Sequence, residues 1–209
     1  MPDWYAWHGD YTDPASGLSA RLRTVQERVR AELDRLPPGP LRVVSMCAGQ
    51  GHDLLGVLVD HPRRDDVSAL LVEYDPRNVA AARVAVADAG LTAVRIVEGD
   101  AGLVDAYAGY APADLVLACG VFGNVSDADI RRTVDACRGL CRRDGAVIWT
   151  RHRREPDLVP QIVDWFEQAG FATHRVTDPH LSRGVGVHHH RADPVPVASG
   201  TRMFAFVDG

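Results

Sequence analysis

The sequence predicts an α/β fold in which helices cover both faces of a doubly wound, mostly parallel sheet. Short apolar segments alternate with amphipathic or alanine-rich segments between residues 41 and 169, and this alternation is typical of a parallel sheet. A glycine turn at residues 49–51 follows the first apolar segment, and acidic residues follow the second and third. This pattern indicates a nucleotide-like ligand at the carboxyl edge of the sheet.

An amphipathic helix is predicted near the start of the chain. Apolar residues from Leu18 to Leu36 recur every three or four positions, and the proline-rich residues 37–40 end the pattern. Residues 1–17 contain two tryptophans and two tyrosines, which is too much apolar surface to leave in water. We therefore expect residues 1–37 to form an aromatic segment with a cap helix, and residues 38–209 to form the main domain.

The remaining elements follow from the same patterns. Strands are expected where apolar or β-branched residues run together, and helices where apolar residues recur at helical spacing. The expected strands are residues 43–47, 69–73, 94–97, 114–119, 146–150, 171–176, 185–190 and 203–207. The expected helices are residues 54–58, 75–89, 127–140 and 158–169.

The composition of the chain indicates its cellular compartment and the kinds of partner it binds. The net charge of −5 argues against a nucleic-acid partner, because phosphate backbones usually bind a basic surface. The four cysteines form no CxxC pair, and no segment resembles a signal peptide or a membrane span. We therefore expect a cytoplasmic monomer or homodimer that binds neither nucleic acid nor membrane.

Three signals on the predicted sheet edge suit an adenosine. Glycine lets the backbone turn sharply at residues 49–51 and lets a ligand lie against it. Glu73 lies about twenty residues after Gly51, where a carboxylate can accept both ribose hydroxyl protons. Asp100 could accept a hydrogen bond from the amine of an adenine. Each acid has an alternative role in a helix cap or a solvated loop, but their order along one edge strengthens the assignment.

The helix start after the glycine turn limits the rest of the ligand. A dinucleotide site has a small residue where this chain has Leu54. Asp53 at the helix N-terminus would repel a diphosphate but suits a sulfonium or an α-amino group. The expected ligand is an adenosine with a cationic, phosphate-free tail, and S-adenosylmethionine fits that description.

Residues from about 41 to 149 resemble the class I S-adenosylmethionine-dependent methyltransferases. The matching motifs are SMCAGQG at residues 45–51, VEYDP at 72–76, EGDA at 98–101 and DLVL at 114–117. The resemblance implies a Rossmann-like sheet with an antiparallel C-terminal strand. Two positions depart from the family pattern. Cys47 replaces the usual first glycine, and Ser45 replaces an acidic residue, so the methionine amine needs another partner, for which Asp53 is the candidate.

The resemblance also implies which residues bind the cofactor. The glycine turn would line it, Glu73 would bind the ribose, residues 100–101 the adenine, and residues 119–121 would flank the methionine moiety. Arg21 could reach the methionine carboxylate. The expected cofactor-binding residues are Arg21, Ala48, Gly49, Gly51, Asp53, Glu73, Tyr74, Asp100, Ala101, Cys119, Gly120 and Val121.

The acceptor is expected to face the loops after the fourth and fifth strands. His152 and Asn124 are the catalytic candidates, since an oxygen nucleophile usually needs a base whereas a neutral amine does not. The expected pocket residues are Trp4, Tyr5, His8, Tyr11, Arg151, Arg153 and His188. The N-terminal aromatics among them could form a lid or pack without touching a ligand, and the arginines could be a solvated basic run.

A metal site is not expected. His188 and His190 share one face of a strand, and His180 could join them, but no cysteine or carboxylate at metal spacing completes the set.

Taken with the cofactor site, the expected function is methyl transfer from S-adenosylmethionine to an oxygen or nitrogen of a small molecule. The alternatives are an NAD-dependent oxidoreductase on a similar fold and a non-catalytic nucleoside-binding or interaction module.

Overall fold

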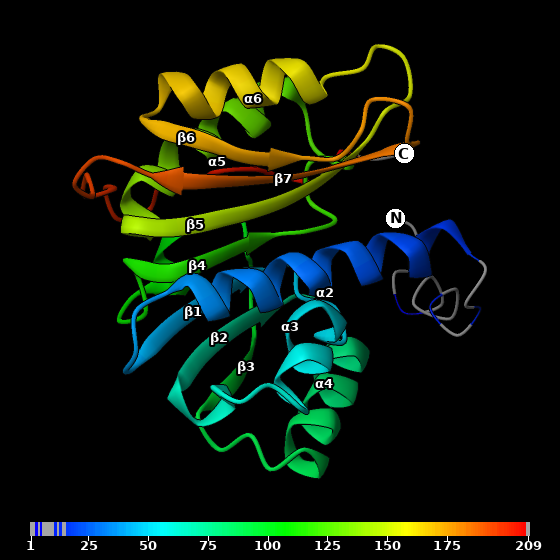
Figure 1. Ribbon diagram of the computed structural model, residues 1–209, viewed down its shortest axis with the longest axis vertical. Helices are drawn as coiled ribbons and strands as arrows, with labels where there is room; N and C mark the ends of the chain where they lie inside the picture. Colours follow the sequence, from blue (N-terminus) through cyan, green and yellow to red (C-terminus); the bar gives the residue numbers. More distant parts are fainter. Residues whose placement is uncertain (1–2, 4, 6–10, 12, 14–15, 208–209) are drawn as a thin grey trace.

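The computed structural model describes residues 3, 5, 11, 13 and 16–207, and its centre is one seven-stranded sheet. The strand order is β3-β2-β1-β4-β5-β7-β6, which Figure 1 shows from β3 at the bottom to β6 near the top. The strands are β1 (Leu41–Met46), β2 (Val67–Glu73), β3 (Val94–Glu98), β4 (Ala113–Ala118), β5 (Cys141–His152), β6 (Phe171–Val176) and β7 (Arg183–His190). The α-helices are α2 (Gly17–Arg35), α3 (His52–Leu58), α4 (Pro76–Asp88), α5 (Asp127–Leu140) and α6 (Val159–Gln168), with short 3-10 helices η2 (Arg64–Asp66) and η3 (Val104–Tyr107).

The sheet is parallel from β3 to β5 and ends in an antiparallel β7, which pairs with both β5 and β6. Apolar side chains of α2, α3 and α4 pack on one face of this sheet, and those of α5 and α6 pack on the other. The predicted doubly wound fold and its antiparallel C-terminal strand are therefore confirmed. The strand order reverses between β1 and β4, and a doubly wound sheet of this kind opens a crevice at such a switch point.

Caps account for the helix boundaries. Ser16 caps α2 by accepting a hydrogen bond from the backbone of Ser19, so the helix begins one residue before the predicted Leu18. Asp75 caps α4 and Pro76 stands at its first position, as the sequence pattern predicts. Helix α5 coincides with the predicted range 127–140.

The prediction of a strand at residues 203–207 is wrong. This segment forms only isolated bridges, between Arg202 and Leu103 and between Phe206 and Val125. It crosses the carboxyl ends of the sheet instead of extending it: the Met203 N–H donates to the Gly102 carbonyl at 2.8 Å. Met203 and Phe204 are buried under the loops after β3 and β4, whereas Phe206 and Val207 are exposed, so the apolar run packs on the body of the protein only in part.

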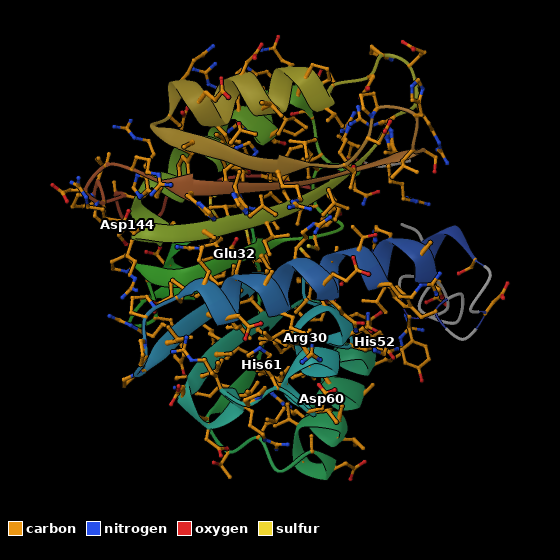
Figure 2. The ribbon with its side chains drawn as sticks, viewed as in Figure 1. Arg30, Glu32, His52, Asp60, His61 and Asp144 are labelled. Carbon is orange, nitrogen blue, oxygen red and sulfur yellow. The ribbon has the colours of Figure 1, made fainter. Side chains whose placement is uncertain are left out.

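Polar contacts hold α2 across the sheet (Figure 2). The Glu32 carboxylate lies 3.0 Å from His189 Nε2 on β7 and accepts from Arg35 at 2.6 Å. Burial alone would raise the pKa of Glu32, but these two partners lower it. Arg30 pairs with Asp60, just beyond α3, at 2.5 Å. These contacts direct the N-terminal turns of α2 toward the carboxyl edge, which His52 marks in Figure 2, while Asp144 marks the opposite edge.

The three consecutive histidines of β7 point to different sides of the sheet. His188 is fully buried and stacks against Phe166 of α6 with ring centroids 4.3 Å apart. It also stacks against Trp149 of β5. His190 lies on the same face as His188, whereas His189 faces α2. The expectation that His188 contacts the acceptor is corrected, because it belongs to the core on the α6 side.

None of the helices in the described part of the chain combines the length and the hydrophobicity that crossing a bilayer requires.

Candidate active site

A cavity of about 900 Å³ opens at the carboxyl edge of the parallel strands. It is lined by the ends of β1, β2, β3, β4 and β5, the N-terminal turns of α2 and α3, and the chain after residue 201. The expected site residues that line it are Tyr11, Arg21, Ala48, Gly49, Asp53, Glu73, Tyr74, Asp100, Ala101, Cys119, Gly120, Asn124, Arg151 and His152. Residues far apart in the sequence therefore converge on one cavity.

Glu73 fixes the shape of the glycine turn. Its carboxylate accepts the backbone N–H of Gly49 at 2.8 Å and that of Asp75 at 2.9 Å. The side chain is only 7% exposed, so both hydrogen bonds form in a largely dry environment. Each carboxylate oxygen has a second acceptor position. Glu73 can thus hold the turn and still accept a hydrogen bond from a hydroxyl group of a ligand.

The two glycines of the turn have different roles. Gly49 lines the cavity with φ +56°. Gly51 is the residue before α3, has φ +78°, and lies outside the cavity lining. A Cβ at Gly51 would lie 2.7 Å from the Leu55 side chain. The expectation that Gly51 lines the cofactor is therefore corrected: this position needs glycine for its left-handed backbone and for packing under the turn.

The β2–β3 end of the cavity carries acids that already have partners. Asp100 accepts the Gly102 N–H at 2.8 Å and pairs with Arg202 at 3.0 Å. Phe204, from the segment mispredicted as a strand, and Arg202 just before that segment form part of the wall there. Sequence reasoning missed both as site residues, although the apolar run at residues 203–207 signalled that this segment packs against the body of the protein.

Asp53 and Arg21 both line the cavity and lie close to Cys119, which directly follows β4. Asp53 lies in the first turn of α3, and Arg21 is a buried residue of α2 that donates to the Tyr11 hydroxyl. Burial raises the pKa of Tyr11, and Arg21 opposes that change. Tyr11 is therefore a neutral phenol at physiological pH. A carboxylate and a guanidinium thus face the same space.

Backbone and side-chain contacts order the β4–β5 end. The Gly120 N–H donates to Thr150 Oγ1 at 2.8 Å, and Asn124 Nδ2 donates to the Gly120 carbonyl at 2.7 Å. Arg151 donates to the Phe122 carbonyl. These contacts fix the loop after β4 against the end of β5.

His152 is presented as a neutral imidazole. Burial lowers its pKa, and the neighbouring Arg151, Arg154 and Arg183 lower it further. Its Nδ1 is 3.3 Å from the backbone N–H of Arg154, which donates to it. This contact suits the tautomer that carries its proton on Nε2. In this tautomer a proton taken up by His152 would bind to Nδ1, and the hydrogen bond from the Arg154 N–H would then be lost.

Several expected site residues lie elsewhere. Val121 is fully buried in the core. Arg153 pairs with Asp157 at 2.7 Å, and its other nitrogen donates to the Thr177 carbonyl, so it holds a loop together outside the cavity lining. Tyr5 is 43% exposed, also outside the lining, and the guanidinium of Arg77 lies over its ring. Trp4 and His8 lie outside the described residues.

The cysteines of the cavity are neutral thiols. Burial raises the pKa of both Cys47 and Cys119, and nearby carboxylates raise it further. All four cysteines of the chain are free. The cavity therefore presents no activated thiolate as a nucleophile.

A sequence family described as "Putative methyltransferase" matches residues 15–164. A comparison with curated proteins gave no match. Among solved structures, an O-methyltransferase family protein from Burkholderia thailandensis superposes with a TM-score of 0.65 at 19% identity, over 83% of this chain and 56% of that one.

Two further solved structures show the same fold. A protein of Bordetella parapertussis described as a possible exported protein gives a TM-score of 0.67 at 18% identity, over 90% of this chain and 79% of that one. A precorrin-6y C5,15-methyltransferase from Geobacter metallireducens gives 0.56 at 14% identity, over 80% and 88%. The family match covers most of the chain, and the structural neighbours superpose on most of it. The chain therefore belongs to this methyltransferase family and has the class I fold of S-adenosylmethionine-dependent methyltransferases.

Proposed function

We propose that the protein transfers a methyl group from S-adenosylmethionine to an oxygen or nitrogen atom of a small-molecule acceptor. The observation that carries the proposal is the convergence of Glu73, Asp100, Asp53 and Arg21 on one cavity. Along the sheet edge, the two acids at the ends of β2 and β3 suit the adenosine. Asp53 and Arg21 suit the charged amino-acid end of the cofactor.

The residues present fit an adenosine bearing an amino acid. Glu73 would accept the ribose hydroxyls, and Asp100 with Ala101 would hold the adenine at the β2–β3 end. Asp53 and Arg21 would pair with the amine and the carboxylate of the methionine moiety. A dinucleotide fits less well, because its diphosphate would lie at the start of α3, where Asp53 stands.

The bound cofactor would supply an activated methyl group, so the protein needs only to position the acceptor and exclude water. Asn124 and Gly120 would shape the acceptor side, since their mutual hydrogen bond fixes the loop after β4. His152 would take the proton of an oxygen acceptor, and its lowered pKa keeps it neutral for that role.

Replacing His152 with alanine is expected to lower kcat by about 10²- to 10⁴-fold, the usual contribution of a general base. The affinity for S-adenosylhomocysteine should stay unchanged. The wild-type rate should rise with pH and reach its plateau below the ordinary histidine pKa of about 6.5. The measurement is S-adenosylhomocysteine release with an acceptor found by screening. A variant that keeps the wild-type rate would contradict the base role.

Calorimetric titration distinguishes the proposed function from its alternatives. S-adenosylhomocysteine should bind and NAD should not. Binding of NAD alone would favour an oxidoreductase. Tight binding of S-adenosylhomocysteine, without methyl transfer to any acceptor in a broad screen, would favour a non-catalytic nucleoside-binding module.

The net charge of −5 and the four free cysteines support a cytoplasmic enzyme that acts on small molecules and not on nucleic acid. Ultracentrifugation would show whether it is the expected monomer or homodimer.

A further inference from the structure

The charges that line the cavity are unevenly distributed. The acidic side chains of the lining are Asp53, Glu73, Asp75 and Asp100. Apart from Asp53, they all lie at the ends of β2 and β3. Asp75 and Asp100 pair with arginines there, at 2.7 and 3.0 Å, and Glu73 is held by backbone N–H groups. Each acid at this end of the cavity therefore already has a partner, and the end carries no excess of positive charge.

The opposite end is lined by three arginines, and none of the acidic residues of the lining stands there. Arg151 is the next-to-last residue of β5, Arg154 follows it by three residues, and Arg183 begins the antiparallel β7. The register pairs Arg183 with His152, so two distant segments meet at this edge. Within the described part of the chain, Arg154 and Arg183 form no ion pair, whereas Arg153 pairs with Asp157 outside the cavity.

A solvated basic run does not account for this arrangement. Such a run would direct its side chains to water, as the exposed Arg154 does, but Arg183 comes from another strand and is only partly exposed. Burial lowers the pKa of Arg183, and the nearby Arg21 and Arg154 lower it further. Burial also lowers the pKa of Arg151, although the charges of Asp127 and Asp157 oppose that change. The fold therefore maintains mutually repelling cations beside a cavity, a cost that a bound anion would offset.

The bound cofactor would not supply that anion. On the proposed function, the methionine carboxylate pairs with Arg21 and the methionine amine pairs with Asp53. The sulfonium adds a further positive charge. Arg154 and Arg183 then still face the acceptor without a counter-charge.

Resting on the proposed function, we infer that the methyl acceptor carries an oxyanion, a carboxylate or a phosphate, that Arg154 and Arg183 bind. The planar guanidinium matches both groups by paired hydrogen bonds. Arg151 adds positive charge while its own nitrogen stays on the Phe122 carbonyl. The acceptor thus has an acidic group at one end and the methylated atom near His152.

The test is a ligand-observed NMR titration of the full chain saturated with S-adenosylhomocysteine. The probes are benzoate and phenyl phosphate, each compared with the neutral benzamide. Aromatic fragments suit the cavity because Tyr11, His52 and Phe206 line it. At least one acid should bind roughly tenfold or more tightly than benzamide, and the stronger acid identifies the kind of oxyanion.

Substitutions of the two arginines test whether the acid binds at the proposed place in the cavity. Arg183→Gln and Arg154→Gln should each weaken binding of the preferred acid by roughly tenfold and leave benzamide binding unchanged. Arg154 is exposed, so its variant should fold even if Arg183→Gln does not. The control is Arg143→Gln, an exposed arginine of β5 that pairs with Asp193 near the opposite edge. It should bind the acid like the wild type.

Equal binding of acid and amide, no binding of either acid up to its solubility limit, or no effect of the Arg154 variant would each overturn the inference. The proposed function fails separately, if S-adenosylhomocysteine itself does not bind in the preliminary calorimetric titration.

Discussion

Glu73→Ala should lose about 1–3 kcal/mol of affinity for S-adenosylhomocysteine, or roughly 5- to 150-fold. Two effects add. The ribose hydroxyls lose their acceptor, and the Gly49 N–H loses the carboxylate that fixes the turn against the ligand. Because Glu73 is 7% exposed, water replaces these hydrogen bonds poorly. Isothermal calorimetry on the two proteins measures the difference directly.

The matched control is Glu98→Ala. Glu98 stands opposite Glu73 in the register of β2 and β3 but is exposed and outside the cavity lining. Its removal should leave the affinity unchanged. Glu73→Gln preserves the volume of the side chain and separates loss of charge from loss of packing. If Glu73→Ala bound the ligand as tightly as Glu98→Ala does, Glu73 would not be part of the site.

Acidification should destabilise the fold through His188. Burial, with a smaller contribution from His189, lowers the pKa of His188 from 6.5 to about 3. Below pH 6.5 the unfolded chain binds a proton that the folded chain excludes, so stability falls as the pH falls toward 3. The slope from this group is at most about 1.4 kcal/mol per pH unit. Above pH 6.5 both states are neutral and the contribution vanishes.

His188→Phe tests this linkage. A phenyl ring can stack between Phe166 and Trp149 as the imidazole does. Urea denaturation at about pH 7.5 and about pH 5 should show a smaller loss of unfolding free energy in the variant. This range stays above the ordinary glutamate pKa, so the lowered pKa of Glu32 does not contribute. Burial also lowers the pKa of His190, which the variant retains, so part of the loss of stability on acidification should remain.

The control for this measurement is His180→Gln, in an exposed loop before β7. It should keep the wild-type difference between the two pH values. If His188→Phe lost as much stability on acidification as the wild type, His188 would not be the group that resists protonation.

Local sequence patterns predicted the elements that local physics determines. The range 127–140 matched α5 because Ser126 caps it and its apolar residues keep a helical period. Strand ends also placed Glu73 and Asp100 correctly on one edge, since successive parallel strands all end there. These inferences needed only the direction of each strand.

Features that depend on distant segments were not predictable in the same way. An alternating strand predicts that His188 and His189 face opposite sides, but not which side packs on α6. Arg183 reaches the cavity only because β7 runs antiparallel beside β5. The apolar residues near Phe204 suggested a strand, whereas their partners are loops after β3 and β4. In each case the tertiary neighbour decides the role.

A crystal structure of the protein with S-adenosylhomocysteine tests the central claim most directly. Electron density for the ligand should fill the cavity, with the ribose hydroxyls on the Glu73 carboxylate and the amino acid between Asp53 and Arg21. Density elsewhere on the surface, or an empty cavity at saturating ligand, would contradict the account.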